Sequence, residues 1–235
     1  MKITLIHDFD PLKEYGWGTP QGIHTQLEKE GHTIVPHPSF PNPGDEPGRR
    51  NCDFSKLISE IEEYDLVLIF HCGPSKAFDE QLAILKANTD VKIFLELADE
   101  PQTYNCNQVR INHVDAMFTP DLRCHNHYLE RGYNSHFMTH WCDDSIFYYD
   151  ESIERENKCV TTCVAIPTEL ISIFGDQFVT KRNITNDENT KFYNSGTIVF
   201  QYARNNEITR RLMEGGGCKN AVLANRISAE TGIYN

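Results

Sequence analysis

The sequence lacks a long apolar run, and no stretch approaches the length that a helix needs to cross a membrane. Its N-terminal segment becomes polar too soon for a secretory signal peptide. Basic residues are also scarce, with 22 lysines and arginines against 34 acidic residues and a formal net charge of -12. This balance disfavours nonspecific binding to nucleic acid or to another polyanion. We therefore expect a cytoplasmic protein with no membrane span and no nucleic-acid partner.

Cysteine pairs with metal-binding spacing are missing as well. The 8 cysteines are scattered along the chain and include no Cys-x-x-Cys pair, so we interpret them as reduced thiols. The segments His125-Asn-His127 and His140-Trp-Cys-Asp-Asp144 contain possible ligands. Neither segment has the spacing of a zinc finger or of a helical i, i+4 metal site. The sequence therefore predicts no metal site.

The first part of the chain alternates between strand-like and helix-like segments. With 39% hydrophobic and 24% charged residues among 235, the chain has an ordinary globular composition and enough length for one large or two small domains. Short alternating units of this kind form a mostly parallel sheet with helices on both faces. Residues 1–149 are accordingly predicted to form a Rossmann-like α/β domain. The expected strands are Lys2–His7, Thr33–Val35, Asp65–Phe70, Val91–Leu97, Asp115–Thr119 and Ser135–Thr139, and the expected helices are Gln21–Glu30, Phe54–Glu63, Ala77–Ala87 and Leu122–Arg131.

A second, shorter α/β unit is predicted over residues 159–235. The segment before it, residues 150–158, is highly charged and has no apolar periodicity, which is typical of a linker. The chain ends soon after its last strand-like run, so we expect this second domain to be short or incomplete. Its expected elements are a strand at Cys159–Ala165, a helix near Thr168–Phe174, a polar stretch at Lys181–Lys191, and strands at Gly196–Tyr202 and Asn220–Asn225.

Between the last two expected strands, residues 206–217 predict a short helix that three glycines end. At 3.6 residues per turn, Glu207, Arg211 and Glu214 share one face, with Arg210 beside it. One interpretation is a surface helix whose i, i+4 ion pairs contribute a few tenths of a kcal/mol each. The other is a ligand site, because ligands of open parallel sheets bind beyond the carboxyl ends of the strands. The position of this helix directly after a buried strand favours the ligand site.

Two loops of the first domain follow expected strands. The long segment Asp8–Pro20 contains glycines and an aromatic residue, and the turn Ala98–Pro101 contains two carboxylates. Because the carboxyl ends of parallel strands meet at one edge of a sheet, we expect both loops to line the same cleft. The pair Asp8 and Asp10 is interpreted as turn-forming rather than metal-binding, since aspartates at a strand exit commonly form turns.

These segments together resemble glycosyltransferases of the GT-B fold. The resemblance rests on the order of Asp115-Ala-Met-Phe-Thr-Pro-Asp121, Tyr128-Leu-Glu-Arg-Gly-Tyr-Asn134 and His140-Trp-Cys-Asp-Asp-Ser-Ile-Phe147. The sequence is most similar to the group related to spore-maturation proteins, in which an arginine, two variable residues and a glutamate precede a small-residue turn. Here that motif reads Arg211-Leu-Met-Glu214 and is followed by glycines. The resemblance implies two Rossmann-like domains and metal-independent transfer of a sugar from a nucleotide-sugar donor to a hydroxyl acceptor.

The chemistry of such a donor assigns expected roles in the second domain. A ribose diol suits a carboxylate acceptor, and a diphosphate suits cationic or amide donors. Glu214 is the candidate ribose ligand, and Arg211 or Arg210 the candidate diphosphate ligand. Backbone N–H groups around Asn206 and Glu207 would add donors at the helix N-terminus. No cofactor is expected besides the donor substrate.

The catalytic carboxylate is left open by the sequence. An inverting reaction needs a general base from the first domain, and Asp8, Asp10, Asp99 and Glu100 all lie on its loops. Many retaining members instead carry a Glu-x7-Glu motif, whereas Glu207 lies one residue nearer to the glutamate of the arginine motif. A noncatalytic nucleotide-sugar-binding module and a nucleotide-sugar epimerase remain alternatives. The catalytic candidates are Asp10, Asp99 and Glu207, and the donor-binding candidates are Arg211, Glu214, Arg210, Asn206, Gly18 and Thr19.

Overall fold

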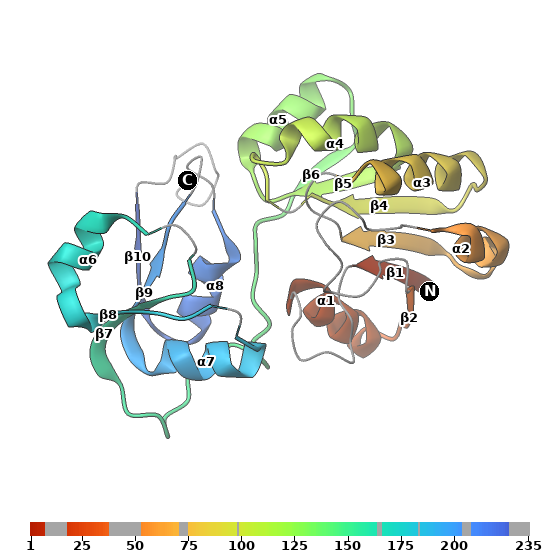
Figure 1. Cartoon of the computed structure of the whole chain (residues 1–235). Coiled ribbons are helices and arrows are strands. Elements are labelled where there is room, and N and C mark those ends of the chain that lie inside the picture. Colours follow the sequence, from red (N-terminus) through yellow and green to blue (C-terminus); the bar gives the residue numbers. More distant parts are fainter. Residues whose placement is uncertain are drawn as a thin grey trace. The chain divides into compact units, whose positions relative to one another are not determined.

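The computed structural model describes residues 1–7, 18–37, 53–70, 75–97, 99–163, 166–182, 184–203 and 208–225. The described residues form two compact units, of which the first comprises residues 1–7 and 20–139 and the second comprises residues 18–19 and the chain from His140 onward. Each unit contains one parallel sheet (Figure 1). The chain thus has the predicted α/β class with two Rossmann-like units.

The first unit alternates strand and helix along the whole of its described chain. Its elements are β1 (Lys2–His7), α1 (Gly18–Lys29), β2 (Thr33–His37), α2 (Ser55–Glu60), the short 3-10 turn η1 (Ile61–Glu63), β3 (Leu66–Phe70), α3 (Lys76–Ala87), β4 (Lys92–Glu96), α4 (Tyr104–Arg110), η2 (Ile111–His113), β5 (Ala116–Thr119), α5 (Leu122–Glu130) and β6 (Ser135–Phe137).

The strand order of the first sheet is β2-β1-β3-β4-β5-β6, and all of its pairs are parallel. The chain moves from β1 outward to β2 and then returns past β1 to β3, so the order reverses between β1 and β3. Figure 1 shows α1 on one side of this sheet and α3, α4 and α5 on the other. The strands are therefore covered on both faces, which explains their nearly continuous apolar character.

The core of the first unit lies between the sheet and the helices that follow β2. Val67 and Ile69 of β3 and Leu82 and Leu85 of α3 are all fully buried and belong to one cluster. Burying a side chain of this size contributes about 1.5 to 3 kcal/mol. This packing fixes the helices against the sheet.

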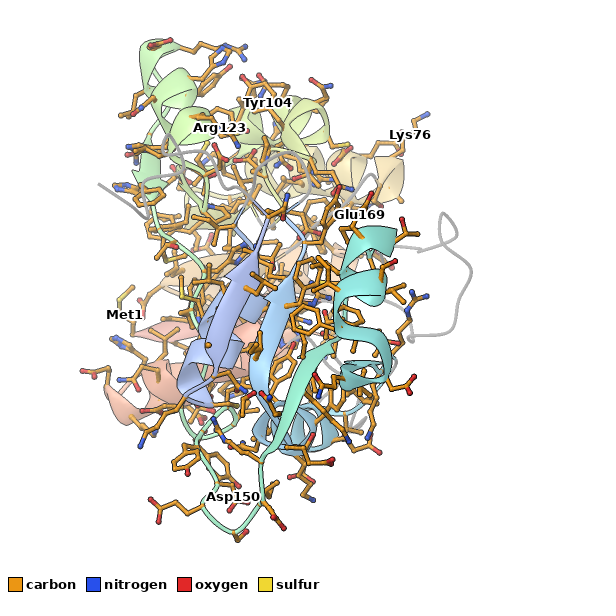
Figure 2. The ribbon with its side chains drawn as sticks, turned by 90° about the vertical axis from the view of Figure 1, so that its left-hand side faces the viewer. Met1, Lys76, Tyr104, Arg123, Asp150 and Glu169 are labelled. Atoms are coloured by element: carbon orange, nitrogen blue, oxygen red, sulfur yellow. The ribbon has the colours of Figure 1, made fainter. Side chains whose placement is uncertain are left out.

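The second unit repeats the same construction on four strands. Its sheet order is β10-β9-β7-β8, with parallel pairing throughout, and the order reverses between β7 and β9. Figure 2 shows these strands side by side, next to the helix that carries Glu169. The elements are β7 (Glu156–Thr161), α6 (Thr168–Phe174), η3 (Gly175–Gln177), β8 (Phe178–Thr180), α7 (Asn186–Asn194), β9 (Gly196–Gln201), α8 (Arg210–Gly217) and β10 (Ala221–Ala224).

One helix of the second unit begins in the stretch Lys181–Lys191, which was predicted only as polar. The structure places α7 there, and Thr185 begins it with a reciprocal capping box to Glu188. Phe192 and Tyr193 at the end of α7 are buried in the core of the unit. Because only this last turn is apolar, the helix has little periodicity for a sequence pattern to detect. The elements α4 and β8 were likewise not predicted.

The predicted linker, residues 150–158, is wrong in its last part because β7 already begins at Glu156. The predicted domain division after residue 149 also lies later than the division in the structure. Phe147 is buried in the core of the second unit. The Asn194 side chain accepts from the Asp150 backbone N–H at 3.0 Å and donates to the Tyr148 carbonyl at 2.8 Å. These contacts fasten the segment after His140 to α7.

In the part of the chain that the structure describes, no helix combines the length and the apolar character needed to span a membrane.

Candidate functional site

The carboxyl edge of the second sheet, where the strand order reverses between β7 and β9, is the candidate site. Thr162 follows β7 and Gln201 ends β9. In the register of β7 and β9, Val160 pairs with Val199. Because side chains alternate along a strand, Thr162 and Gln201, two positions later, lie on the same face of the sheet as this pair. That face is the one that α8 covers, because a Cβ on Gly215 of α8 would lie 3.0 Å from the Cβ of Val199.

A chain of hydrogen bonds joins α8 to α7 and β7 at this edge. Arg211 Nε donates to Thr162 Oγ1 at 2.9 Å, and Thr162 Oγ1 lies 3.0 Å from Tyr193 OH. Tyr193 OH donates to Glu214 Oε2 at 3.4 Å, and Arg210 Nε lies 3.2 Å from Glu214 Oε1. Because the single phenol proton is directed to the carboxylate, Thr162 donates to the Tyr193 oxygen. The two arginines at the start of α8 are therefore connected through one polar chain, which we call the α8 polar chain.

The α8 polar chain is buried at its centre and accessible at one end. Tyr193 is 0% exposed and Glu214 only 4%, whereas the side chain of Arg210 is 35% exposed. Burial, followed by the negative charge of Glu214, raises the pKa of Tyr193 well above its usual value. The phenol thus stays protonated and available as a donor to the carboxylate.

These environments bear on one of the two sequence-based interpretations of the helix, the surface helix. The predicted i, i+4 pair between Arg210 and Glu214 is present, but its carboxylate is buried rather than on a solvated face. The surface-helix interpretation is therefore wrong for Glu214. Glu207 and Asn206 lie outside the described residues, so the predicted pair between Glu207 and Arg211 stays a prediction.

The start of α8 differs from the predicted one. Ile208 and Thr209 precede the helix, which begins at Arg210 and so starts later than the predicted residue 206. Thr209 is the N-cap residue, and its side chain makes no capping hydrogen bond. The backbone N–H groups of the first turn are consequently not satisfied by the cap side chain and are directed beyond the helix end.

The three glycines are part of α8 and do not end it, which corrects the second boundary. A Cβ on Gly217 would lie 2.6 Å from the carbonyl oxygen of Phe147 and 3.2 Å from Cys142 Sγ. Gly215 meets Val199 closely, as described above, whereas a Cβ on Gly216 would have no neighbour within 4 Å. Two of the three glycines therefore serve close packing of the helix within the second unit.

Gly217→Ala is expected to lower the free energy of unfolding by about 1 to 3 kcal/mol, the range for overpacking a filled site. Gly216→Ala is the matched control, and it should raise stability by about 0.5 to 1 kcal/mol because alanine favours the helix. Urea denaturation of both variants measures the difference. Equal stabilities of the two variants would contradict the packing role of Gly217.

A further buried polar group lies at the same edge. Gln201 is 0% exposed, and within the part of the chain that the structure describes neither polar atom of its carboxamide has a hydrogen-bond partner. The sequence did not indicate Gln201, Thr162 or Tyr193 as site residues. Gln201 ends β9, Tyr193 lies on α7 and Thr162 follows β7, and only the contact between these distant segments gives each residue a place in the site.

In the first unit, the turn after β4 presents one accessible carboxylate. Asp99 is exposed and has a φ of 59°, a left-handed conformation that aspartate tolerates better than most residues. Its carbonyl accepts from the Thr103 N–H at 3.0 Å, which holds the turn. Asp8 and Asp10 lie outside the described residues.

Glu100, the other carboxylate of this turn, has a structural role. It is 1% exposed and accepts hydrogen bonds from Thr119 Oγ1 at 2.5 Å, from Asn107 Nδ2 at 2.9 Å and from Tyr128 OH. Burial raises the pKa of Glu100, although these hydrogen bonds oppose the rise. A carboxylate with three buried donors is not available to an acceptor hydroxyl in solvent. The inclusion of Glu100 among the candidate bases is therefore wrong.

The remaining sequence candidates belong to the N-terminal part of the chain. Gly18 and Thr19 lie in the first turn of α1, which begins before the predicted start at Gln21, and not in the loop where the sequence placed them. His7, which the sequence did not indicate, ends β1 at the strand-order reversal of the first sheet. Burial, and then the charge of His24, lowers the pKa of His7 to about 4.

Among the described residues, no group of three or more histidine, cysteine, aspartate or glutamate side chains is arranged to hold a metal ion.

Comparisons with known proteins support the fold. No protein-family model matches the chain, and no curated protein matches it in sequence. Among solved structures, it is similar to a sucrose-phosphate synthase from Thermosynechococcus elongatus, with a TM-score of 0.60 and 10% sequence identity. The match covers 97% of this chain and 82% of that one. The neighbour has the GT-B glycosyltransferase architecture, so the chain has a GT-B-like fold.

Proposed function

We propose that this protein is a glycosyltransferase that moves a sugar from a nucleotide-sugar donor to a hydroxyl acceptor. The observation that carries the proposal is the α8 polar chain, which gathers two guanidinium groups and a carboxylate at the strand-order reversal of the second sheet. Open parallel sheets bind their ligands at such reversals. The GT-B-like fold also supports a glycosyltransferase. Membership of the group related to spore-maturation proteins is part of the proposal.

The donor would use the groups at the start of α8. A nucleoside diphosphate leaving group develops negative charge as its bond to the sugar breaks, and Arg211 and Arg210 would stabilise that charge. Backbone N–H groups of the first turn of α8, which the cap side chain does not bind, would add neutral donors. In this proposal the guanidinium groups perform the role that a metal ion has in other transferases, and Glu214 accepts the ribose hydroxyls.

Asp99 is the proposed general base because it is an exposed carboxylate at the carboxyl end of a strand of the first sheet. Its left-handed backbone is the kind of local strain that proteins retain at functional positions. Asp10 and Glu207 remain alternative catalytic candidates, and Asn206, Gly18 and Thr19 remain proposed donor contacts. A cytoplasmic location also belongs to the proposal.

Calorimetric titration with UDP, GDP and dTDP tests the donor site. We expect at least one nucleoside diphosphate to bind, and Arg211→Ala to weaken its affinity by about 10- to 100-fold, the effect of losing a hydrogen bond to a charged group. Arg131→Ala, which removes an exposed arginine of the first unit, is the control and should leave the affinity unchanged. Absence of binding to the wild type, or equal affinities of the wild type and Arg211→Ala, would contradict the proposed site.

Incubation with nucleotide-sugars and an acceptor panel separates the proposal from its alternatives. Release of free nucleoside diphosphate that depends on the acceptor indicates a transferase. An altered sugar on an intact donor indicates an epimerase, and binding without turnover indicates a noncatalytic module.

A further inference from the structure

Each oxygen of Glu214 has a partner within the second unit. Oε1 pairs with Arg210 Nε at 3.2 Å, Oε2 accepts from Tyr193 OH at 3.4 Å, and the residue is only 4% exposed. Each carboxylate oxygen can accept more than one hydrogen bond, but Glu214 has almost no exposed surface through which a ribose diol could reach it. A diol therefore gains access to the carboxylate only when one of the two present partners moves away.

Arg210 is the partner that can leave at lower cost. Its side chain is 35% exposed, so water can hydrate the released guanidinium. Tyr193 is 0% exposed, and its hydroxyl would lose its acceptor inside the protein, which costs the full desolvation of a buried polar group. The asymmetry in exposure therefore assigns the movable contact to Arg210.

The neighbouring arginine is held differently. Arg211 Nε donates to Thr162 Oγ1 at 2.9 Å, and Thr162 is tied in turn to Tyr193 at 3.0 Å. This contact fixes the guanidinium of Arg211 over the end of β7 and does not involve Glu214. The first turn of α8 thus carries one anchored cation and one cation whose present partner is the carboxylate that the donor needs.

We propose that donor binding exchanges the partner of Glu214, so that the ribose diol replaces the Arg210 guanidinium and the released guanidinium pairs with the diphosphate. This exchange rests on the proposed function. No covalent bond forms or breaks in the exchange, and net charge is conserved at each group. Its consequence is that the site favours ligands that carry both groups, because a diol alone must break the ion pair without supplying a new anion for Arg210.

A nucleoside and its diphosphate therefore respond in opposite directions to the loss of Arg210. Arg210→Ala removes the competitor for Glu214, so the affinity for the nucleoside should rise by about 2- to 5-fold, corresponding to a partly exposed ion pair. The same change removes the cation that the diphosphate would gain, so the affinity for the nucleoside diphosphate should fall by about 10-fold or more. Arg211→Ala should weaken the diphosphate alone.

The experiment is calorimetry on the wild type, Arg210→Ala and Arg211→Ala. The ligands are UDP or GDP, whichever binds, the ribonucleoside with the same base, and the corresponding 2′-deoxynucleoside. Because dTDP lacks the 2′-hydroxyl, binding of dTDP alone would overturn the exchange. The 2′-deoxynucleoside lacks the diol and should gain no affinity from Arg210→Ala. Arg210→Gln is a second variant that removes the charge while it keeps a polar side chain, and circular dichroism of both variants checks that they are folded.

Each outcome separates the exchange from the proposed function. Tighter nucleoside binding with weaker diphosphate binding in Arg210→Ala and Arg210→Gln supports the exchange. Nucleoside affinity that falls or stays unchanged, while the wild type still binds the diphosphate, overturns the exchange and leaves the donor site intact. A wild type that binds none of the diphosphates overturns both.

Discussion

Glu100→Ala should lower the free energy of unfolding by about 3 to 5 kcal/mol, the cost of leaving several buried polar groups without their shared partner. The three donors, Thr119, Asn107 and Tyr128, converge on this carboxylate from outside its own turn. Removing the carboxylate leaves those donors in an interior from which water is excluded. The expected loss is large compared with the stability of an average domain.

Asp99→Asn is the matched variant at the adjacent residue. Asp99 is exposed and asparagine tolerates the same left-handed backbone, so the free energy of unfolding should change by less than about 0.5 kcal/mol. If Asp99 is the general base, the same variant should lose sugar transfer by about 100-fold or more while it still binds the nucleoside diphosphate. Urea denaturation, nucleotide titration and a transfer assay on both variants measure these effects. A destabilised Asp99→Asn together with an unaffected Glu100→Ala would contradict the assignment of roles in the turn.

The stability of the protein should fall as the pH decreases from about 6.5 to about 4, because His7 is buried as a neutral imidazole. The pKa of His7 is lowered from 6.5 to about 4 in the folded protein. In this window the unfolded chain binds a proton that the folded protein does not, so acidification favours unfolding. At about 1.4 kcal/mol per pKa unit, the contribution lost over the whole window is about 3 kcal/mol.

Denaturant unfolding of the wild type and His7→Gln at pH 7.5 and pH 4.5 measures this contribution. The variant should lose about 2 kcal/mol less than the wild type between the two conditions. Parallel losses in the wild type and His7→Gln would show that another group causes the pH dependence.

Glu100 acts on stability in the opposite direction over part of this pH range. Burial raises the pKa of Glu100 above its ordinary value of 4.5, so the folded protein keeps a proton that the unfolded chain has released. Its contribution is complete below pH 4.5 and is lost as the pH rises through the raised pKa. Comparing the wild type with His7→Gln cancels this effect, since Glu100 titrates in both proteins.

The alternation of strands and helices, and with it the two parallel sheets, followed from the sequence alone. Strands such as β3 and β9 are continuous apolar or β-branched runs, and a run of this kind is buried wherever the chain places it. The ion pair between Arg210 and Glu214 was also predictable, because i, i+4 residues meet on any helix. These features depend on residues that are near one another in the chain.

The environment of each polar side chain was decided by the tertiary structure. Asp99 and Glu100 are adjacent in the sequence, yet the turn exposes one and directs the other into the interior. Glu214 is buried because Tyr193 of α7 lies beneath α8, and Arg211 is anchored because β7 brings Thr162 to the same place. A local pattern fixes which residues share a helix face or a strand face, whereas exposure, pKa and hydrogen-bond partners are set by segments that only folding brings together.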